Sequence, residues 1–203
     1  MTCDRRSFGV MQADRLSQFP LRCGRVHEVY GPASVAFAAI AGAKGAVLWI
    51  GQAWQGAQLN PIGFETFLDP AQLLLARTQN QTDSLAIAEE ALKDGALPFV
   101  VIETTRTLDL REGRRLQLAA KAGGTTGLCL IPEGMGSNAA ETRWHAAPVF
   151  DPARDDSTLM RWEIIKNKAG TIGAWNVRWE RETRRVHVVS PAGERPGFTR
   201  TPD

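Results

Sequence analysis

Short runs of consecutive apolar residues recur along the first two thirds of the chain, and segments with helical spacing separate them. Strands that are buried on both faces of a parallel sheet have this continuous apolar character, because neither face meets water. Four runs fit this description, at residues 46–50, 73–76, 98–102 and 128–131. Helices or helical turns are predicted at residues 33–41, 61–67, 83–93 and 109–122. Alternating strands and helices of these lengths predict an α/β fold with a mostly parallel central sheet.

Two of the predicted helices carry terminal signals. Thr82 or Asp83 is a suitable N-cap for one of them, and Gly95 follows its last turn. Asp109 and Glu112 have the spacing of a capping box at the start of the other. These signals support the helical assignment independently of the apolar pattern.

The texture changes after residue 142, where apolar and polar residues partly alternate in short segments separated by turns. Such alternation is typical of antiparallel strands. We therefore predict that antiparallel strands in the C-terminal half extend the parallel sheet, at residues 143–149, 160–166, 174–179 and 185–189. The predicted organisation is an N-terminal arm at 1–24, one domain at 25–189 and a flexible C-terminal tail at 190–203.

Composition limits the class of protein. A chain of 203 residues with 43% apolar residues can bury one sizeable core. Its net charge of +2 indicates neither a nucleic-acid binder nor a protein for acidic substrates. Its longest run of consecutive apolar residues, at 35–41, has seven residues, far short of the roughly 20 that span a bilayer. The three cysteines lack the spacing of a disulfide framework or a metal site, so we predict a cytoplasmic protein without a bound metal.

A degenerate phosphate-binding loop is predicted before the first helix. The motif G-x-x-x-x-G-K-[ST] uses its lysine and hydroxyl to hold phosphates and magnesium. Read against it, Gly31 keeps the first position, but Ala36, Phe37 and Ala38 stand at the last three. The residues assigned to this loop are Gly31, Pro32, Ser34 and Phe37. The alternative for this segment is an ordinary turn. Glu103, at the end of a predicted strand, is a candidate remnant metal ligand, and the alternative for Glu103 is a solvated carboxylate.

Several segments in a defined order resemble the RecA/SulA superfamily, and within it the ImuA family of RecA-like accessory proteins in bacterial mutagenesis cassettes. The resemblance extends over about residues 25–180. Its most specific part is an Arg-Arg-Leu-Gln-Leu-Ala-Ala helix followed by Gly-Gly and a buried strand. The matching segments are residues 25–32, 48–50, 68–75, 91–96, 108–110, 114–120 and 161–168.

The resemblance implies a RecA-like three-layer fold and a place in SOS-induced translesion DNA synthesis. The implied partners are an ImuB-type polymerase relative and an error-prone replicative-type polymerase, with RecA and single-stranded or primer-template DNA as further candidates. RecA recombinases also carry a water-activating glutamate after the strand that follows the phosphate loop, and residues 50–54 contain no carboxylate. We therefore expect no ATPase activity and no cofactor.

Basic residues supply the candidates for DNA or partner binding. Arg106, Arg111, Arg114 and Arg115 cluster on one predicted helix and the turn before it. Arg143 and Trp144 flank a polar segment at 134–142, where RecA proteins carry a mobile DNA-contacting loop. Lys166 and Lys168 resemble lysines that reach across a RecA filament interface. The alternatives are solvated charges and, for Trp144, packing inside the sheet.

Two other functions remain open. A cell-division inhibitor of the SulA type would bind the bacterial tubulin homologue. A degenerate ATPase would need another lysine near the phosphates, for which Lys44, or Lys166 from a neighbouring subunit, is a candidate. The basic helix and the long C-terminal half favour the translesion hypothesis.

Overall fold

The computed structural model describes residues 16, 18–54, 59–152, 158–170 and 172–191. A nine-stranded sheet forms the middle of the molecule, in the order β3-β2-β4-β5-β1-β6-β7-β8-β9. Its strands are β1 (Val26–Tyr30), β2 (Val47–Gln52), β3 (Leu73–Thr78), β4 (Phe99–Glu103), β5 (Thr126–Leu130), β6 (Thr142–Pro148), β7 (Leu159–Asn167), β8 (Gly173–Glu180) and β9 (Arg185–Pro191).

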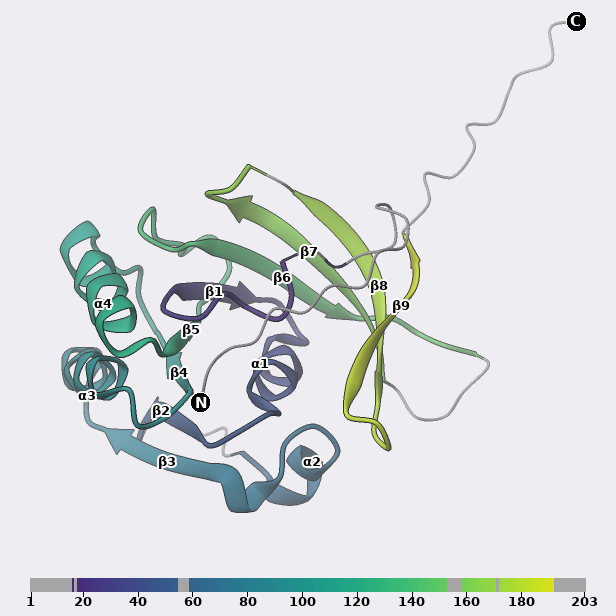
Figure 1. The fold of residues 1–203 in the computed structure, drawn as a ribbon, viewed down its shortest axis with the longest axis horizontal. Coiled ribbons are helices and arrows are strands. Elements are labelled where there is room, and N and C mark those ends of the chain that lie inside the picture. The colour runs from purple at the N-terminus through teal and green to yellow at the C-terminus, as the bar shows by residue number, and fades with distance from the viewer. Residues whose placement is uncertain (1–15, 17, 55–58, 153–157, 171, 192–203) are drawn as a thin grey trace, which may run out of the picture.

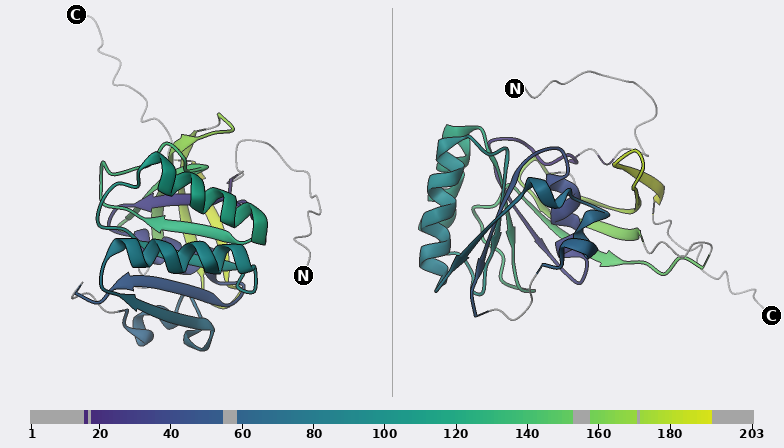
Figure 2. Two further views of the ribbon diagram at one scale, coloured as in Figure 1. Left: turned by 90° about the vertical axis from the view of Figure 1, so that its left-hand side faces the viewer. Right: turned by 90° about the horizontal axis from the view of Figure 1, so that it is seen from below.

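Helices cover both faces of the parallel half of this sheet. They are α1 (Ser34–Gly42), α2 (Pro61–Glu65), α3 (Gln81–Asp94) and α4 (Leu110–Gly123), with a 3-10 turn at Pro70–Gln72. Figures 1 and 2 show α3 and α4 side by side on one face, and α1 and α2 on the other. None of the helices in the described part of the chain is long and apolar enough to cross a membrane.

The pairing of the strands confirms the mixed sheet. Strands β1 to β5 pair only in parallel with one another. Strand β6 is parallel to β1 but antiparallel to β7, and the pairs from β6 to β9 are antiparallel. The parallel part therefore extends one strand further than the alternation in the sequence indicates, because β6 joins β1 at the centre of the sheet.

The helix ends follow the sequence signals with one correction. Asp109 and Glu112 form both hydrogen bonds of the capping box, at 2.7 and 2.9 Å. Gly95 ends α3 with a left-handed φ of 76°. The N-cap of α3 is Asn80, whose side chain accepts a hydrogen bond from the Asp83 amide, so neither Thr82 nor Asp83 is the cap.

The end of the predicted N-terminal arm packs onto the domain. The Phe19 ring lies 5.0 Å from Trp162 and 6.0 Å from Phe37, measured between ring centroids, and Leu21 is buried. At the other terminus, the last residues of β9 already belong to the predicted tail. Residues 1–15 and 192–203 lie outside the described part of the chain, so the arm and tail beyond these points stay predictions.

His27 links the buried face of β1 to its surroundings. Its Nδ1 lies 2.7 Å from the Thr142 hydroxyl, and its Nε2 lies 3.1 Å from the Arg22 carbonyl oxygen. Because the carbonyl can only accept, Nε2 carries the proton and Nδ1 accepts from Thr142. The hydroxyl oxygen in turn accepts a hydrogen bond from the Trp144 indole at 2.8 Å. The neutral imidazole therefore forms a hydrogen bond through each of its nitrogens in this buried network.

We expect the stability of the protein to fall between pH 6.5 and 4. Burial lowers the pKa of His27 from 6.5 to about 4, against smaller opposing effects that include the Glu141 carboxylate. In this window the unfolded chain binds a proton that the folded chain excludes, so the stabilisation is complete above pH 6.5 and is lost toward pH 4. The difference corresponds to about 3 kcal/mol. Urea unfolding across this range measures it.

A His27→Gln variant provides the control, because glutamine does not titrate. The slope of its unfolding free energy with pH should be smaller than that of the unmodified protein by up to one proton. Equal slopes in the two proteins would show that other groups cause the acid sensitivity.

Candidate functional site

The turn between β1 and α1 stands where a phosphate-binding loop is predicted. Helix α1 begins at Ser34, only three residues after Gly31. The Ser34 amide donates to the Gly31 carbonyl at 3.0 Å, and the Ala33 amide donates to the Ala146 carbonyl of β6 at 3.0 Å. A phosphate-binding loop needs a longer arc of backbone whose amides point at the ligand. Here the turn is contracted, and the amides of Ala33 and Ser34 are already bonded within the protein.

Strand β6 fills the space beside this turn. Gly31 has a left-handed φ of 99°. A Cβ atom at this position would lie 2.5 Å from the Ala146 carbonyl oxygen and 2.7 Å from Cδ2 of His145. Glycine is therefore required by the close approach of β6 and by the backbone conformation, and its presence does not depend on a nucleotide.

Phe37 replaces the lysine of the phosphate-loop motif, and it faces the core. Its side chain is completely buried on the inner side of α1. The centroid of its ring lies 4.6 Å from that of Trp162 and 5.4 Å from that of Trp144. Ala38, at the motif's hydroxyl position, is also fully buried. The positions that would hold phosphate and magnesium therefore contribute to packing.

A mostly apolar hollow of about 470 Å³ lies at the edge where the parallel strands β4 and β5 end. Val35, Phe64 and Leu130 are among the residues that line it, and Glu103 supplies a carboxylate. The Glu103 Oε1 accepts a hydrogen bond from the Trp49 indole at 2.6 Å. The apolar lining suits an apolar group. Because the lining contains no lysine or arginine, it supplies no positive charge to compensate a bound polyphosphate.

Gln52 lies at the end of β2, in the region where the water-activating glutamate is expected from the resemblance. Its Nε2 donates to the Thr105 hydroxyl at 3.1 Å, and its Oε1 accepts from the Trp54 indole at 2.9 Å. An amide at this place does not act as a general base at neutral pH. No group of three or more His, Cys, Asp or Glu side chains suited to a metal ion occurs among the residues that the structure describes.

The two lysines proposed for an ATPase do not lie at the turn. Lys44 follows the C-terminal end of α1, and a helix of nine residues is about 14 Å long. The Lys166 ammonium donates to the carbonyl oxygens of Ser137, Asn138 and Ala140 at 2.8 to 3.2 Å. Lys44 therefore lies near the other end of α1 from the turn, and the role of Lys166 from a neighbouring subunit stays a prediction.

The predicted mobile segment at 134–142 is held in place by basic side chains. Lys168 donates to the Ala139 carbonyl at 2.6 Å, beside the three carbonyl bonds of Lys166. Arg143 donates to the Ser137 carbonyl at 2.9 Å and forms an ion pair with Glu28 at 2.8 Å. Burial is the main factor that lowers the pKa of Lys166. These side chains therefore stabilise the segment, whatever else they bind.

Glu28 is the residue of this cluster that the sequence did not reveal. Its side chain is 1% exposed, and it accepts hydrogen bonds from the Ser137 amide at 2.8 Å and from Arg143. A single glutamate within an apolar strand gives no signal for a partner 115 residues away. The Glu28–Arg143 pair therefore could not be identified from the positions of charged residues in the sequence.

Trp144 requires a correction, because the sequence makes it a candidate for binding DNA or a partner. Its ring is completely buried between Phe37, Trp162 and Trp175. Its indole nitrogen donates to Thr142. A base cannot reach this ring without opening the core, so the alternative prediction of internal packing is confirmed.

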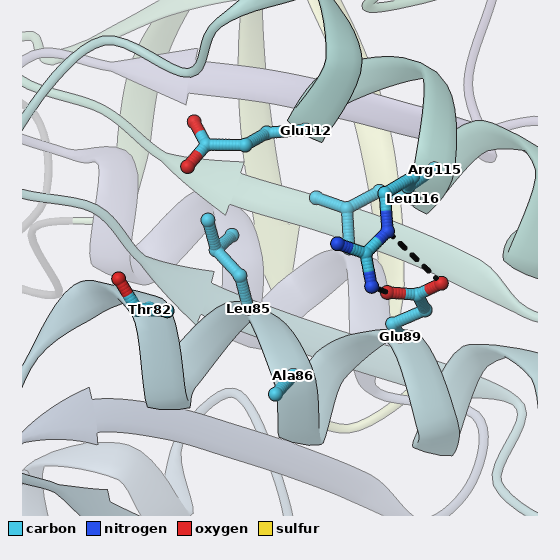
Figure 3. Close-up of a pocket in the computed structure, with 7 residues that line it drawn as sticks. All are labelled: Thr82, Leu85, Ala86, Glu89, Glu112, Arg115 and Leu116. Carbon is cyan, nitrogen blue, oxygen red and sulfur yellow. Dashed lines mark hydrogen bonds and ion pairs between the residues drawn. The ribbon is translucent and has the colours of Figure 1, made fainter.

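The arginines around α4 divide into two groups. Arg106 forms a bidentate pair with Glu112, at 2.6 and 2.9 Å, which also lowers the pKa of that carboxyl. Arg115 forms an ion pair with Glu89 of α3, beside a hollow of about 110 Å³ between the two helices (Figure 3). A hollow of this size is well below the roughly 300 Å³ of a small-molecule site.

Arg111 and Arg114 form the second group. Both are exposed, and within the described ranges neither has a carboxylate partner. Arg114 lines a shallow groove together with Leu110, Leu118 and Lys168. Among the predicted DNA-binding or partner-binding residues on α4, these two have guanidinium groups that are free to bind an external anionic group.

No family model matches the sequence. The chain is a distant homologue of Protein ImuA from Caulobacter vibrioides strains NA1000 and CB 15, with 30% identity over 149 residues in each case. Each match covers 64% of this chain and 59% of the relative, so the chain matches less than two thirds of the length of these proteins.

The fold resembles the crystal structure of the RadB recombinase. The TM-score is 0.60 and the identity is 14%, and the superposition covers 83% of this chain and 92% of that chain. At this identity the likeness shows the fold alone. The chain therefore has a RecA-like α/β fold with a parallel core and antiparallel C-terminal strands.

Proposed function

We propose that this chain is a non-catalytic, RecA-like subunit of a cytoplasmic complex for error-prone translesion DNA synthesis. The observation that carries the proposal is the distant homology to Protein ImuA, which covers 64% of this chain. The contracted turn at Gly31 and the buried ring of Phe37 support the non-catalytic part. The fold would then serve as a scaffold for other proteins.

The geometry of the turn gives the physical argument against ATP hydrolysis. Catalysis of phosphoryl transfer depends almost entirely on positioning and on stabilising charge. The Ala33 amide is bonded to β6, the lysine position holds Phe37, and an amide stands at Gln52. Each missing group commonly costs a factor of 100 or more in rate. Together they support a subunit without an ATP cycle.

The proposed partners follow from the homology. They are an ImuB-type polymerase relative and an error-prone replicative-type polymerase, with RecA as a further candidate. Arg111 and Arg114 are the proposed contacts for single-stranded or primer-template DNA, because their guanidinium groups are exposed and α4 displays them together. Arg143, Lys166 and Lys168 are proposed to contact DNA or a partner only in addition to the bonds that hold residues 137–140.

The proposal predicts the outcome of one set of binding experiments with the purified chain. Calorimetric titration with ATP and magnesium should give no saturable heat. The chain should retain the ImuB-type protein and the error-prone polymerase in a pull-down, and single-stranded DNA should increase the recovery.

Two outcomes would contradict the proposal. Magnesium-dependent ATP binding would refute the non-catalytic part. Retention of the bacterial tubulin homologue in place of the polymerase proteins would support a cell-division inhibitor of the SulA type.

A further inference from the structure

A second hollow of ligand-binding size lies away from the turn at Gly31. It has a volume of about 600 Å³ and is bounded by the C-terminal end of α1, the β8–β9 hairpin and the segment before β1. Figure 1 shows β9, the edge strand of the sheet, to the right of α1. Its apolar lining includes Ile40, Trp179, Val186 and Val188. This volume is within the range of pockets that bind ligands or anchor side chains.

Basic groups surround the apolar lining. Lys44 follows α1, Arg184 lies in the turn between β8 and β9, and Arg185 and His187 belong to β9. No carboxylate is among the lining residues. The hollow therefore combines an apolar floor with a positive rim.

The charges of the rim are only partly compensated by neighbouring residues. The Arg184 guanidinium donates to the Phe67 carbonyl at 3.1 Å, which orients it without removing its charge. His187 lies 3.1 Å from Glu180, a carboxylate that also accepts from Thr183. Within the described ranges, neither Lys44 nor Arg185 has a carboxylate at ion-pair distance. An anionic group at the rim would therefore meet at least two charges without an internal partner.

The aromatic residues of the lining favour a protein segment over nucleic acid. Proteins bind single strands by stacking bases on accessible aromatic faces. Trp179 is 3% exposed, and its indole donates to the Thr66 carbonyl at 2.7 Å. The ring of Phe19 packs against Phe37 and Trp162. The Trp179 ring therefore has almost no accessible face, and the half-buried Phe19 ring is held by two aromatic neighbours, so the lining offers no row of open rings for successive bases.

We propose that this hollow binds an acidic segment of a partner protein, with an apolar side chain as the anchor in the hollow and carboxylates at Lys44 and Arg185. Complementary charge would guide the segment to the rim, and burial of the anchor would supply most of the affinity. The inference does not depend on a role in translesion synthesis. It concerns a surface at the opposite end of α1 from the degenerate phosphate loop.

The test uses the full chain and fluorescently labelled synthetic peptides. The probe is a short peptide in which Asp and Glu flank a central Leu-Phe-Leu. One control peptide replaces its acidic residues by Lys, and another replaces Leu-Phe-Leu by Ser. Anisotropy titration should show saturable binding of the probe, weakened at least about 10-fold in each control peptide, which corresponds to about 1.4 kcal/mol. Added salt should weaken the binding.

Variants of the protein locate the site. The double variant Lys44→Glu and Arg185→Glu should weaken probe binding by at least about 10-fold, or about 1.4 kcal/mol. The matched double variant Lys93→Glu and Lys121→Glu makes the same change of charge on the exposed ends of α3 and α4. It should bind the probe as the unmodified protein does. Circular dichroism and urea unfolding check that both double variants are folded.

Three results would overturn the proposal. The first is the absence of saturable probe binding to the unmodified protein. The second is an equal loss of binding in the two double variants. The third is a single-stranded oligonucleotide that displaces the probe and loses affinity only in the Lys44 and Arg185 variant, because the occupant would then be nucleic acid.

Discussion

Replacement of Phe37 by alanine is expected to lower the free energy of unfolding by about 3–5 kcal/mol. The ring is fully buried and contacts the rings of Trp144, Trp162 and Phe19, so its removal leaves a cavity among groups that belong to three separate segments. Urea unfolding followed by circular dichroism measures the change. Val35→Ala, two residues away at a side chain that is 39% exposed, is the matched control and should cost less than about 1 kcal/mol.

The variant Phe37→Lys tests whether a lysine at the same position allows the protein to bind ATP. It restores the lysine of the phosphate-loop motif in the sequence, but in this fold the ammonium group would enter the aromatic core. Burial of an unpaired charge is strongly unfavourable. We expect a loss of stability at least as large as that of the alanine variant and no gain of ATP binding. A stable Phe37→Lys protein that binds ATP would show that the turn can open into a phosphate loop.

The regular elements could be predicted from the sequence because simple rules govern them. Residues 46–50, 98–102 and 128–131 read as buried strands since both faces of β2, β4 and β5 are covered by helices. The capping box at Asp109 works through atoms only three residues apart. Such local signals do not require knowledge of the rest of the fold.

The turn at Gly31 could be predicted only in part. Comparison with the phosphate-loop motif identifies the missing lysine and hydroxyl, but it assumes a loop of unchanged length. In the structure the helix already begins at Ser34, and the Ala33 amide is bonded to Ala146 of β6, more than a hundred residues away. Only the tertiary arrangement reveals that the space for a phosphate has been filled.

The roles of basic side chains were the least predictable. Lys166 and Lys168 lie in or next to the strand β7, where helical i,i+3 and i,i+4 spacing does not bring side chains together. Their ammonium groups bind carbonyl oxygens of residues 137–140. Conversely, Lys44 and Arg185 are far apart in the sequence and come to the same hollow through the position of β9. Charge counting finds clusters along a chain, whereas binding surfaces are assembled by the fold.

Removal of the Arg143 side chain is expected to be the other strongly destabilising change. In Arg143→Ala the Glu28 carboxylate, which is 1% exposed in the unmodified protein, would lose its guanidinium partner, and the Ser137 carbonyl would lose a hydrogen bond. Breaking a buried ion pair from one side typically costs about 3–5 kcal/mol, because an uncompensated charge stays in the interior. Urea unfolding at neutral pH measures this loss.

The double variant with Glu28→Gln separates the cost of the unpaired charge from the loss of packing. Glutamine keeps a side-chain oxygen that can accept from the Ser137 amide, as Glu28 does at 2.8 Å. In the Arg143→Ala background, Glu28→Gln should therefore restore part of the lost stability, although the same substitution destabilises the unmodified protein. Additive losses in this double-mutant cycle would show that the pair contributes no coupling energy. The ordering of residues 137–140 would then have to depend on the carbonyl bonds of Lys166 and Lys168, not on the Glu28–Arg143 pair.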